Sequence, residues 1–279
     1  MNPSAAAQIE IRGLTMAYGS FVVMRDINAT IRRGEVFVIM GGSGCGKSTL
    51  LRHMIGLKPP AAGDVYYDGV PFWHSPPEAR TERLRRFGVL FQNGALWSSM
   101  TLAENIGLVL GEFTDFPAAE IRAIARLKLA LVGLRGFEDY YPAEISGGMA
   151  KRAGLARALA LDPEILFFDE PSAGLDPVSS RNLDTLILQL RDSLGATFVI
   201  VTHELASIFA IADNSVLLDP ETRTMRASGH PRELLRQTTD AAVRRFLTRG
   251  GADAVPEAAI GTPTAPAAGS FTPNSPHRL

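Results

Sequence analysis

Short apolar runs of strand length recur along most of the chain and predict a β-sheet core. Residues 9–14 alternate apolar and polar positions, as a half-buried strand does, and residues 21–31 have similar strand character. Residues 35–40 form a nearly continuous apolar run, which is typical of a strand buried on both faces of a parallel sheet. Comparable runs follow at residues 88–91, 165–168 and 197–202.

Stretches of helical spacing separate these runs, at residues 47–55, 149–161 and 178–194. Strands that alternate with helices predict an α/β fold with a largely parallel sheet. Strand signals vanish between residues 102 and 134. We therefore expect residues of about 93–160 to form a helical insert in the α/β body, which resumes at Ile165.

The composition changes near the C-terminus. Residues 250–279 are rich in Pro, Gly and Ala, and their only charged side chains are Asp253, Glu257 and Arg278. Such a segment cannot bury enough apolar surface to offset its ordering entropy, so we expect it to be disordered. The predicted organisation is one folded domain over residues 1–249 and a tail over residues 250–279.

Charge and cysteine content exclude several functional classes. The 28 Lys and Arg residues balance 29 Asp and Glu residues, for a net charge of −1, so bulk charge disfavours nucleic acid as a partner. The single cysteine, Cys45, excludes an intrachain disulfide and a zinc site of two or four cysteines. The apolar runs are too short to cross a bilayer, so we expect any membrane role to come through a partner.

A glycine-rich stretch follows the strand predicted at residues 35–40 and precedes a predicted helix. It matches G-x-x-x-x-G-K-[ST], a loop whose backbone N–H groups point inward and, with the helix N-terminus, bind phosphate. We expect Lys47 to reach the β- and γ-phosphates of a nucleotide and Ser48 to ligate Mg²⁺. The alternative is a glycine-rich turn with an exposed lysine. The candidate phosphate-binding residues are Gly41, Gly42, Ser43, Gly44, Cys45, Gly46, Lys47, Ser48 and Thr49.

Polar residues end three of the predicted strands. Asp169 and Glu170 follow the run at 165–168 and fall at the carboxyl edge of the sheet, where α/β folds bind ligands. Asp169 is a candidate to hold Mg²⁺ through water, and Glu170 is placed to polarise an attacking water; the alternative is two solvated acids. His203 is a candidate contact for the γ-phosphate, and Gln92 for Mg²⁺ and the attacking water.

A second anion-binding helix start is predicted at Ser146-Gly147-Gly148, which precedes the helical run at 149–161. A chain with one phosphate loop has no obvious need of it. A head-to-tail dimer explains it, with each of these turns closing on the nucleotide of the other chain. An ordinary helix cap is the alternative that spacing alone leaves open.

These residues resemble the motifs of the ATP-binding cassette (ABC) ATPases. Residues 41–49 look like the Walker A motif, residues 165–170 like Walker B, and residues 145–149 like the signature motif. Further matches are Gln92 to the Q-loop, His203 to the switch histidine, Asp176 to the end of the D-loop, and Tyr18 to the aromatic residue that stacks on adenine.

The resemblance covers about residues 8–248. It implies the P-loop ATPase fold, an α/β fold with a mostly parallel sheet, an N-terminal antiparallel β part and a helical subdomain at about 93–160. It also implies a homodimer enclosing two ATP·Mg²⁺, in which Glu170 activates water, His203 and Gln92 orient it, and Lys47 acts at the phosphates. A non-transport ABC protein and a nucleotide-binding module without turnover remain alternatives.

A finer resemblance concerns the cargo. The signature runs Ser-Gly-Gly-Met-Ala-Lys-Arg, with Met149 where Gln is usual, and residues 93–101 follow the Q-loop residue. Both stretches look like the ATPases of Mla-type phospholipid transporters and their Mce-type relatives. This implies an integral permease in the bacterial inner membrane, a periplasmic MCE-domain lipid-binding protein, a STAS-domain protein on the ATPase, and a place for the chain at the cytoplasmic face. The alternative is an ABC transporter ATPase for a different cargo.

Overall fold

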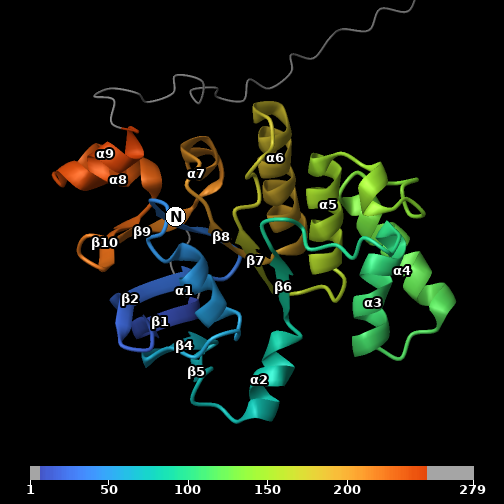
Figure 1. Ribbon diagram of the computed structural model, residues 1–279, viewed down its shortest axis with the longest axis horizontal. Helices are drawn as coiled ribbons and strands as arrows, with labels where there is room; N and C mark the ends of the chain where they lie inside the picture. The colour runs from blue at the N-terminus through green and yellow to red at the C-terminus, as the bar shows by residue number, and fades with distance from the viewer. Residues whose placement is uncertain (1–6, 250–279) are drawn as a thin grey trace, which may run out of the picture.

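Two β-sheets organise the part of the chain that the computed structural model describes, residues 7–249 (Figure 1). The tail expected to be disordered, residues 250–279, lies outside the described residues. The larger sheet within the described part has six strands in the order β10-β9-β3-β8-β7-β6. All neighbouring pairs are parallel except β9 with β10. The strands are β3 (Val36–Gly41), β6 (Phe87–Leu90), β7 (Ile165–Asp169), β8 (Thr197–Val201), β9 (Asn214–Asp219) and β10 (Thr224–Gly229).

The second sheet is antiparallel and has the order β2-β1-β4-β5. Its strands are β1 (Ala7–Tyr18), β2 (Phe21–Arg32), β4 (Ala62–Tyr67) and β5 (Val70–Pro71). Helix α1 (Lys47–Met54) packs between the two sheets, because its Leu50, Leu51 and Met54 share one apolar core with β1, β2 and β4. Phe37 and Ile39 of β3 face this core.

The opposite face of the six-stranded sheet is covered by helices, and Val36, Val38 and Met40 of β3 face that second core. Strand β3 is therefore buried on both faces, as its continuous apolar pattern predicts. The covering helices include α5 (Gly147–Ala158), α6 (Pro177–Leu194), α7 (Leu205–Ile211) and α9 (Ala241–Leu247). Helix α8 (Pro231–Gln237) precedes α9, and α2 (Pro77–Leu84) precedes β6.

Residues 93–160 contain only helical elements, namely α3 (Leu102–Phe113), α4 (Ala118–Leu131), the 3-10 turn η1 (Pro142–Glu144) and α5. Helices α3 and α4 lie on the far side of α5 from the sheet (Figure 1). Thr101 begins α3 with a capping box, in which its hydroxyl accepts from the Glu104 N–H and the Glu104 carboxylate accepts from the Thr101 N–H. Within residues 7–249, no helix combines the length and apolarity that crossing a membrane requires.

The observed architecture confirms the predicted α/β class with its antiparallel N-terminal part. Sequence reasoning did not anticipate β4, β5, β9, β10, α2 or the short helices α7 to α9. In β4, Asp64 occupies a buried position because its carboxylate accepts hydrogen bonds from the backbone N–H groups of Val65, Trp73 and His74. A satisfied buried acid interrupts the apolar pattern that would otherwise mark the strand.

Candidate functional site

The loop from β3 to α1 follows a path that its glycines make available. Gly41 has φ 154°, and a Cβ there would lie 2.6 Å from Cys45 Sγ and 2.7 Å from the Leu218 carbonyl oxygen. Gly46 precedes α1 with φ 96°. Both positions exclude larger residues on steric grounds. Cys45 is buried in the apolar core beneath the loop. Its burial raises the pKa of its thiol, which disfavours the reactive thiolate.

Lys47 and Ser48 begin helix α1 and turn toward neighbouring strands. The Lys47 ammonium donates to the carbonyl oxygens of Gly41 at 3.1 Å and Gly42 at 3.0 Å. Its Nζ also lies 3.8 Å from Glu170 Oε1, and both side chains are largely buried. The Ser48 hydroxyl donates to Asp169 Oδ1 at 2.9 Å. These contacts join the phosphate loop to the carboxyl end of β7.

Glu170 lies at the centre of this cluster. Its φ is 49°, an uncommon left-handed conformation for a residue with a side chain, and its N–H donates to the Val201 carbonyl on β8. Oε1 lies 2.9 Å from Nδ1 of His203, whose ring is about half exposed. Oε2 is buried and has no hydrogen-bond partner among the described residues. Glu170 thus has one carboxylate oxygen beside Lys47 and His203 and a second, buried oxygen that can still accept a hydrogen bond or a proton.

Gln92 directly follows Leu90 and Phe91 at the carboxyl end of β6, and its side chain is exposed. Within residues 7–249 that side chain makes no hydrogen bond, whereas its backbone carbonyl accepts one from Lys151 Nζ at 2.5 Å. Lys151 lies on α5, is 8% exposed, and also donates to the Glu170 carbonyl at 3.4 Å. Sequence reasoning did not single out Lys151, because a lysine in a helix is ordinarily a solvated residue.

The residues predicted to act across a dimer stand at the starts of α5 and α6, and within residues 7–249 they make no hydrogen bond to this cluster. Ser146 is exposed and begins α5, where its hydroxyl accepts from the Met149 N–H at 3.3 Å, and Gly147 beside it is also exposed. Asp176 begins α6 and accepts from the N–H groups of Val178 and Ser179. A Cβ on Gly148 would lie 3.8 Å from Ser179 Oγ, so the starts of α5 and α6 are neighbours.

Tyr18 ends β1 and is 46% exposed. The Lys58 ammonium lies 3.9 Å from its ring centroid. A hydrogen bond with the side chain of Thr49, in the first turn of α1, is the main cause that lowers the pKa of the Tyr18 phenol. Ser43 and Gly44 form the exposed crest of the loop.

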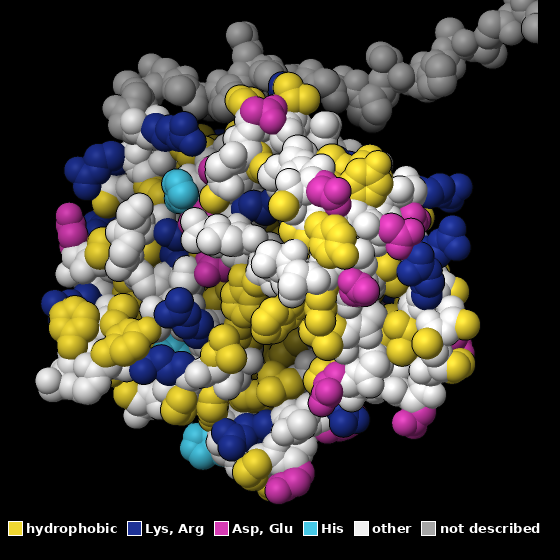
Figure 2. All heavy atoms as spheres, turned by 45° about the vertical axis from the view of Figure 1, so that its right-hand side comes forward, with side chains coloured by type: hydrophobic (Ala, Val, Ile, Leu, Met, Phe, Trp, Pro, Cys, Tyr) yellow, Lys and Arg dark blue, Asp and Glu magenta, His cyan; other side chains and the backbone are white. Residues whose placement is uncertain are grey.

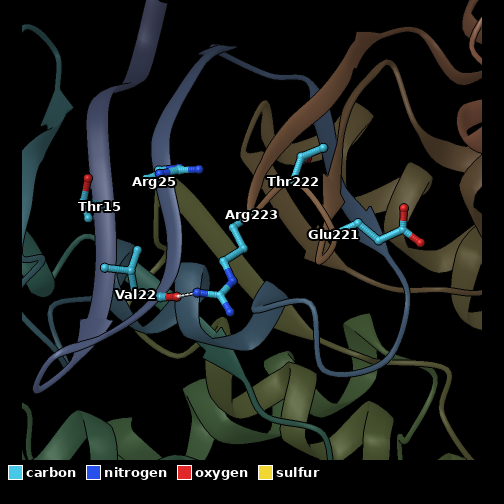
Figure 3. A pocket seen from close by; sticks show the side chains of 6 residues that line it. All are labelled: Thr15, Val22, Arg25, Glu221, Thr222 and Arg223. Carbon is cyan, nitrogen blue, oxygen red and sulfur yellow. Dashed lines mark hydrogen bonds between the residues drawn. The ribbon is translucent and has the colours of Figure 1, made fainter.

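Two pockets border the described surface near these elements. One, of about 590 Å³, is lined by Thr15, Val22, Arg25, Glu221, Thr222 and Arg223, where β2 meets the turn between β9 and β10 (Figure 3). None of the predicted site residues lines it, and Arg223 at its wall donates to the Val22 carbonyl at 3.3 Å. The second, of about 230 Å³, includes Gly42 of the phosphate loop together with Asp219, Arg226 and Phe246.

The candidate catalytic residues thus follow strand ends at one edge of the sheet. Strands β3, β8, β7 and β6 are consecutive and parallel, so the phosphate loop, His203, the Asp169–Glu170 pair and Gln92 follow their carboxyl ends in that order. This edge is the ligand-binding edge of open α/β sheets. The fold and site define a P-loop nucleotide-binding cassette.

Comparison with known proteins identifies the family. The protein-family model described as ABC transporter matches residues 24–173 of this chain. The chain is 45% identical over 239 residues to the probable ribonucleotide transport ATP-binding protein mkl of Mycobacterium tuberculosis, covering 86% of this chain and 66% of that protein. It is 37% identical over 251 residues to the intermembrane phospholipid transport system ATP-binding protein MlaF of Escherichia coli, covering 88% and 91%.

A solved relative agrees. The dimeric structure of a post-hydrolysis state of an ATP-binding cassette bound to ADP and Pi matches with TM-score 0.70 and 28% identity, over 80% of this chain and 98% of that chain. This protein belongs to the ABC transporter family, in the class of ATP-hydrolysing cassettes. The predicted family, fold and class of enzyme are confirmed. The chain spans 66% of the length of the mycobacterial relative and nearly all of MlaF.

Proposed function

We propose that this chain is the ATP-hydrolysing subunit of an ABC transporter that moves phospholipids between the inner membrane and the periplasm or outer membrane. The observation that carries the catalytic part is the Glu170 carboxylate, buried 3.8 Å from Lys47 and 2.9 Å from His203 at the carboxyl edge of the sheet. The proposed location is the cytoplasmic face of the bacterial inner membrane.

Each side chain at this edge has a distinct task in phosphoryl transfer. The loop N–H groups and Lys47 bind the β- and γ-phosphates, and the γ-phosphate oxygens take over contacts that Lys47 makes with the Gly41 and Gly42 carbonyls. Glu170 accepts a proton from the attacking water, and His203 and Gln92 orient that water. Tyr18 stacks on the adenine through its exposed ring.

The residues present fit a magnesium ion that accompanies the nucleotide. Ser48 Oγ and Asp169 Oδ1 are hard oxygen ligands 2.9 Å apart, and Gln92 follows a neighbouring strand. Ser48 and Gln92 would hold the ion directly, and Asp169 through water. When bound, the ion neutralises the charge that develops on the phosphate oxygens.

The second half of each nucleotide site comes from another copy of the chain. Ser146, Gly147 and Gly148 begin α5 at the surface, with N–H groups available to an anion. Asp176 begins the neighbouring helix α6. In a head-to-tail homodimer these two helix starts close on the γ-phosphate bound by the partner.

The phospholipid cargo rests on the finer sequence resemblance and on the MlaF relative. The Met149 signature and residues 93–101 resemble those of the Mla type, and MlaF of Escherichia coli matches 88% of this chain at 37% identity. The second candidate cargo is a ribonucleotide, because the mycobacterial relative with 45% identity carries that name.

The proposed membrane partner is an integral permease, linked to a periplasmic MCE-domain lipid-binding protein, with a STAS-domain protein on the ATPase. Apolar side chains stand exposed in the helical part of the chain and just before it, among them Phe91, Trp97, Leu108 and Phe113. Figure 2 brings this side forward and shows hydrophobic side chains gathered around a hollow. Apolar side chains gathered on an exposed face favour a protein partner.

Hydrolysis by the purified chain tests the catalytic proposal. Release of phosphate from ATP should require Mg²⁺, and at protein concentrations below the dimer dissociation constant its rate should rise with the square of the concentration. A rate strictly proportional to concentration throughout would contradict shared sites. The absence of phosphate release at all concentrations would refute the enzyme itself.

Purification of the tagged chain from its native membrane tests the cargo. We expect a permease and an MCE-domain protein to copurify, and phospholipid vesicles to stimulate ATP hydrolysis by the reconstituted complex. Stimulation by ribonucleotides, with a different permease in the complex, would replace the phospholipid proposal and leave the catalytic proposal standing.

A further inference from the structure

Helix α5 holds the backbone that follows β6 through two cationic side chains. Lys151 Nζ donates to the Gln92 carbonyl at 2.5 Å. Arg157 donates to the carbonyls of Ala95 at 2.6 Å and Gly94 at 3.0 Å. Between them, Gly154 allows close contact, because a Cβ there would lie 3.0 Å from the Gly94 carbonyl oxygen. Residues 92–95 are therefore bound to α5 along two helical turns.

Lys151 alone of these two cations also reaches the strand that carries the acidic pair. Its Nζ lies 3.4 Å from the carbonyl oxygen of Glu170. That carbonyl belongs to a residue in the left-handed conformation, with φ 49°, so a hydrogen bond to it helps to hold an otherwise uncommon backbone. In the described part of the chain, the Arg157 side chain donates hydrogen bonds to residues 94 and 95 alone.

Because Lys151 is buried, its ammonium depends on its hydrogen bonds to the two carbonyls. The side chain is 8% exposed, and burial is the main cause that lowers the pKa of its ammonium, while the charges of Glu170 and Glu204 oppose that effect. Removing an ammonium group from water is unfavourable unless polar partners replace the water. Here the partners are two backbone carbonyls, each belonging to a residue of the catalytic cluster.

We infer that Lys151 is a positioning residue for ATP hydrolysis. Its ammonium binds helix α5 to the backbone carbonyls of both Gln92 and Glu170. This inference rests on the proposed hydrolytic function. Lys151 touches no substrate atom; it sets where the Gln92 and Glu170 side chains lie when the Ser146 end of the same helix closes on nucleotide. A displacement of the attacking water of about 1 Å is enough to cost on the order of 100-fold in rate.

Lys151→Met tests the inference, because methionine keeps the apolar stem and removes the ammonium. The matched control is Lys128→Met, since Lys128 is 4% exposed and its Nζ bonds Asp162 Oδ1 at 2.5 Å, away from the cluster. We expect Lys151→Met to lower kcat at least tenfold, about 1.4 kcal/mol, with KM for ATP within about twofold. Lys128→Met should leave kcat within about twofold despite a comparable fall in Tm.

Two further variants separate positioning from general stability. Lys151→Arg restores a cation that can donate to both carbonyls and should recover most of kcat. Arg157→Met releases residues 94–95 without touching Glu170, so its kcat should fall less than that of Lys151→Met. If Lys151→Met does not fold, Lys151→Gln and Lys151→Arg decide the matter, with kcat expected to be low in the first and recovered in the second.

The outcomes that overturn the inference differ from those that overturn the function. Wild-type hydrolysis with equal kcat in the Lys151 and Lys128 variants would refute the positioning role and leave the enzyme intact. A loss at Lys151 that Lys151→Arg does not recover, or one matched by a rise in KM, would also refute it. Failure of the wild-type chain to hydrolyse ATP would refute both proposals.

Discussion

Replacement of Glu170 by glutamine is the sharpest perturbation of this site. Glutamine keeps the size of the side chain and its contact to His203 Nδ1, now 2.9 Å from a carboxylate oxygen, but cannot accept a proton from water. General-base catalysis contributes on the order of 100- to 10,000-fold, so kcat should fall at least about 100-fold, or about 2.7 kcal/mol of transition-state stabilisation.

Nucleotide binding should respond in the opposite direction. The Lys47 ammonium lies 3.8 Å from Glu170 Oε1, and two unit charges at that distance interact by about 4 kcal/mol at an effective dielectric constant of 20. In Glu170→Gln the ammonium loses this attraction and is free for the γ-phosphate. The affinity for ATP should therefore stay equal or increase, and a closed dimer should accumulate.

The assay compares phosphate release and ATP titration in Glu170→Gln and in a control. Glu164→Gln is that control, because Glu164 directly precedes β7 at its amino end and pairs with Arg86 and Arg33 outside the cluster. This control should keep kcat within about twofold. A kcat for Glu170→Gln within a few-fold of wild type would refute the general-base role. A large loss of ATP affinity in Glu170→Gln would refute the argument that the Glu170 charge competes with the γ-phosphate for the Lys47 ammonium.

Three further predictions concern binding, the dimer and pH. Lys47→Ala should weaken ATP binding at least about tenfold, since charge-assisted hydrogen bonds contribute about 1.5–3 kcal/mol, and unchanged affinity in a titration would contradict the phosphate loop. Ser146→Ala should abolish most hydrolysis while the monomer still binds ATP, whereas Thr101→Ala, which removes a helix cap of the same chemistry, should lower stability by about 1 kcal/mol and leave hydrolysis intact; equal activities would contradict the shared site. Burial raises the pKa of Asp184 from 3.8 to about 6 in the folded chain, so folding binds a proton at intermediate pH, and the free energy of unfolding should fall by about 2 kcal/mol as pH rises from 4 to 7. Asp184→Asn should remove that slope in urea unfolding, and the same slope in the variant would place its origin elsewhere.

Most of the helices and strands that were predicted correctly were predicted from patterns of neighbouring residues. The buried strand β3, the phosphate loop and the helix cap at Ser146 are each encoded within about ten consecutive residues, so sequence reasoning could locate them. Strand β9 was missed because its apolar core is short and lies between Ser215 and Asp219. It forms because Phe37 to Gly41 of β3 offer it a parallel partner, which no local window reveals.

The candidate site divides in the same way. The sequence alone determined the kinds of chemistry present, because a glycine loop with lysine, an acidic pair after an apolar run and a serine-glycine helix start each require only neighbouring residues. Tertiary structure decided that β6, β7, β8 and β3 lie side by side, and so brought Glu170 to Lys47 and His203 from segments far apart in the chain. It alone revealed Lys151, which sequence reasoning did not single out, as a buried donor to two site residues. The reason is physical: strand order and side-chain burial depend on contacts between distant segments, and these contacts have no signature in the spacing of nearby residues.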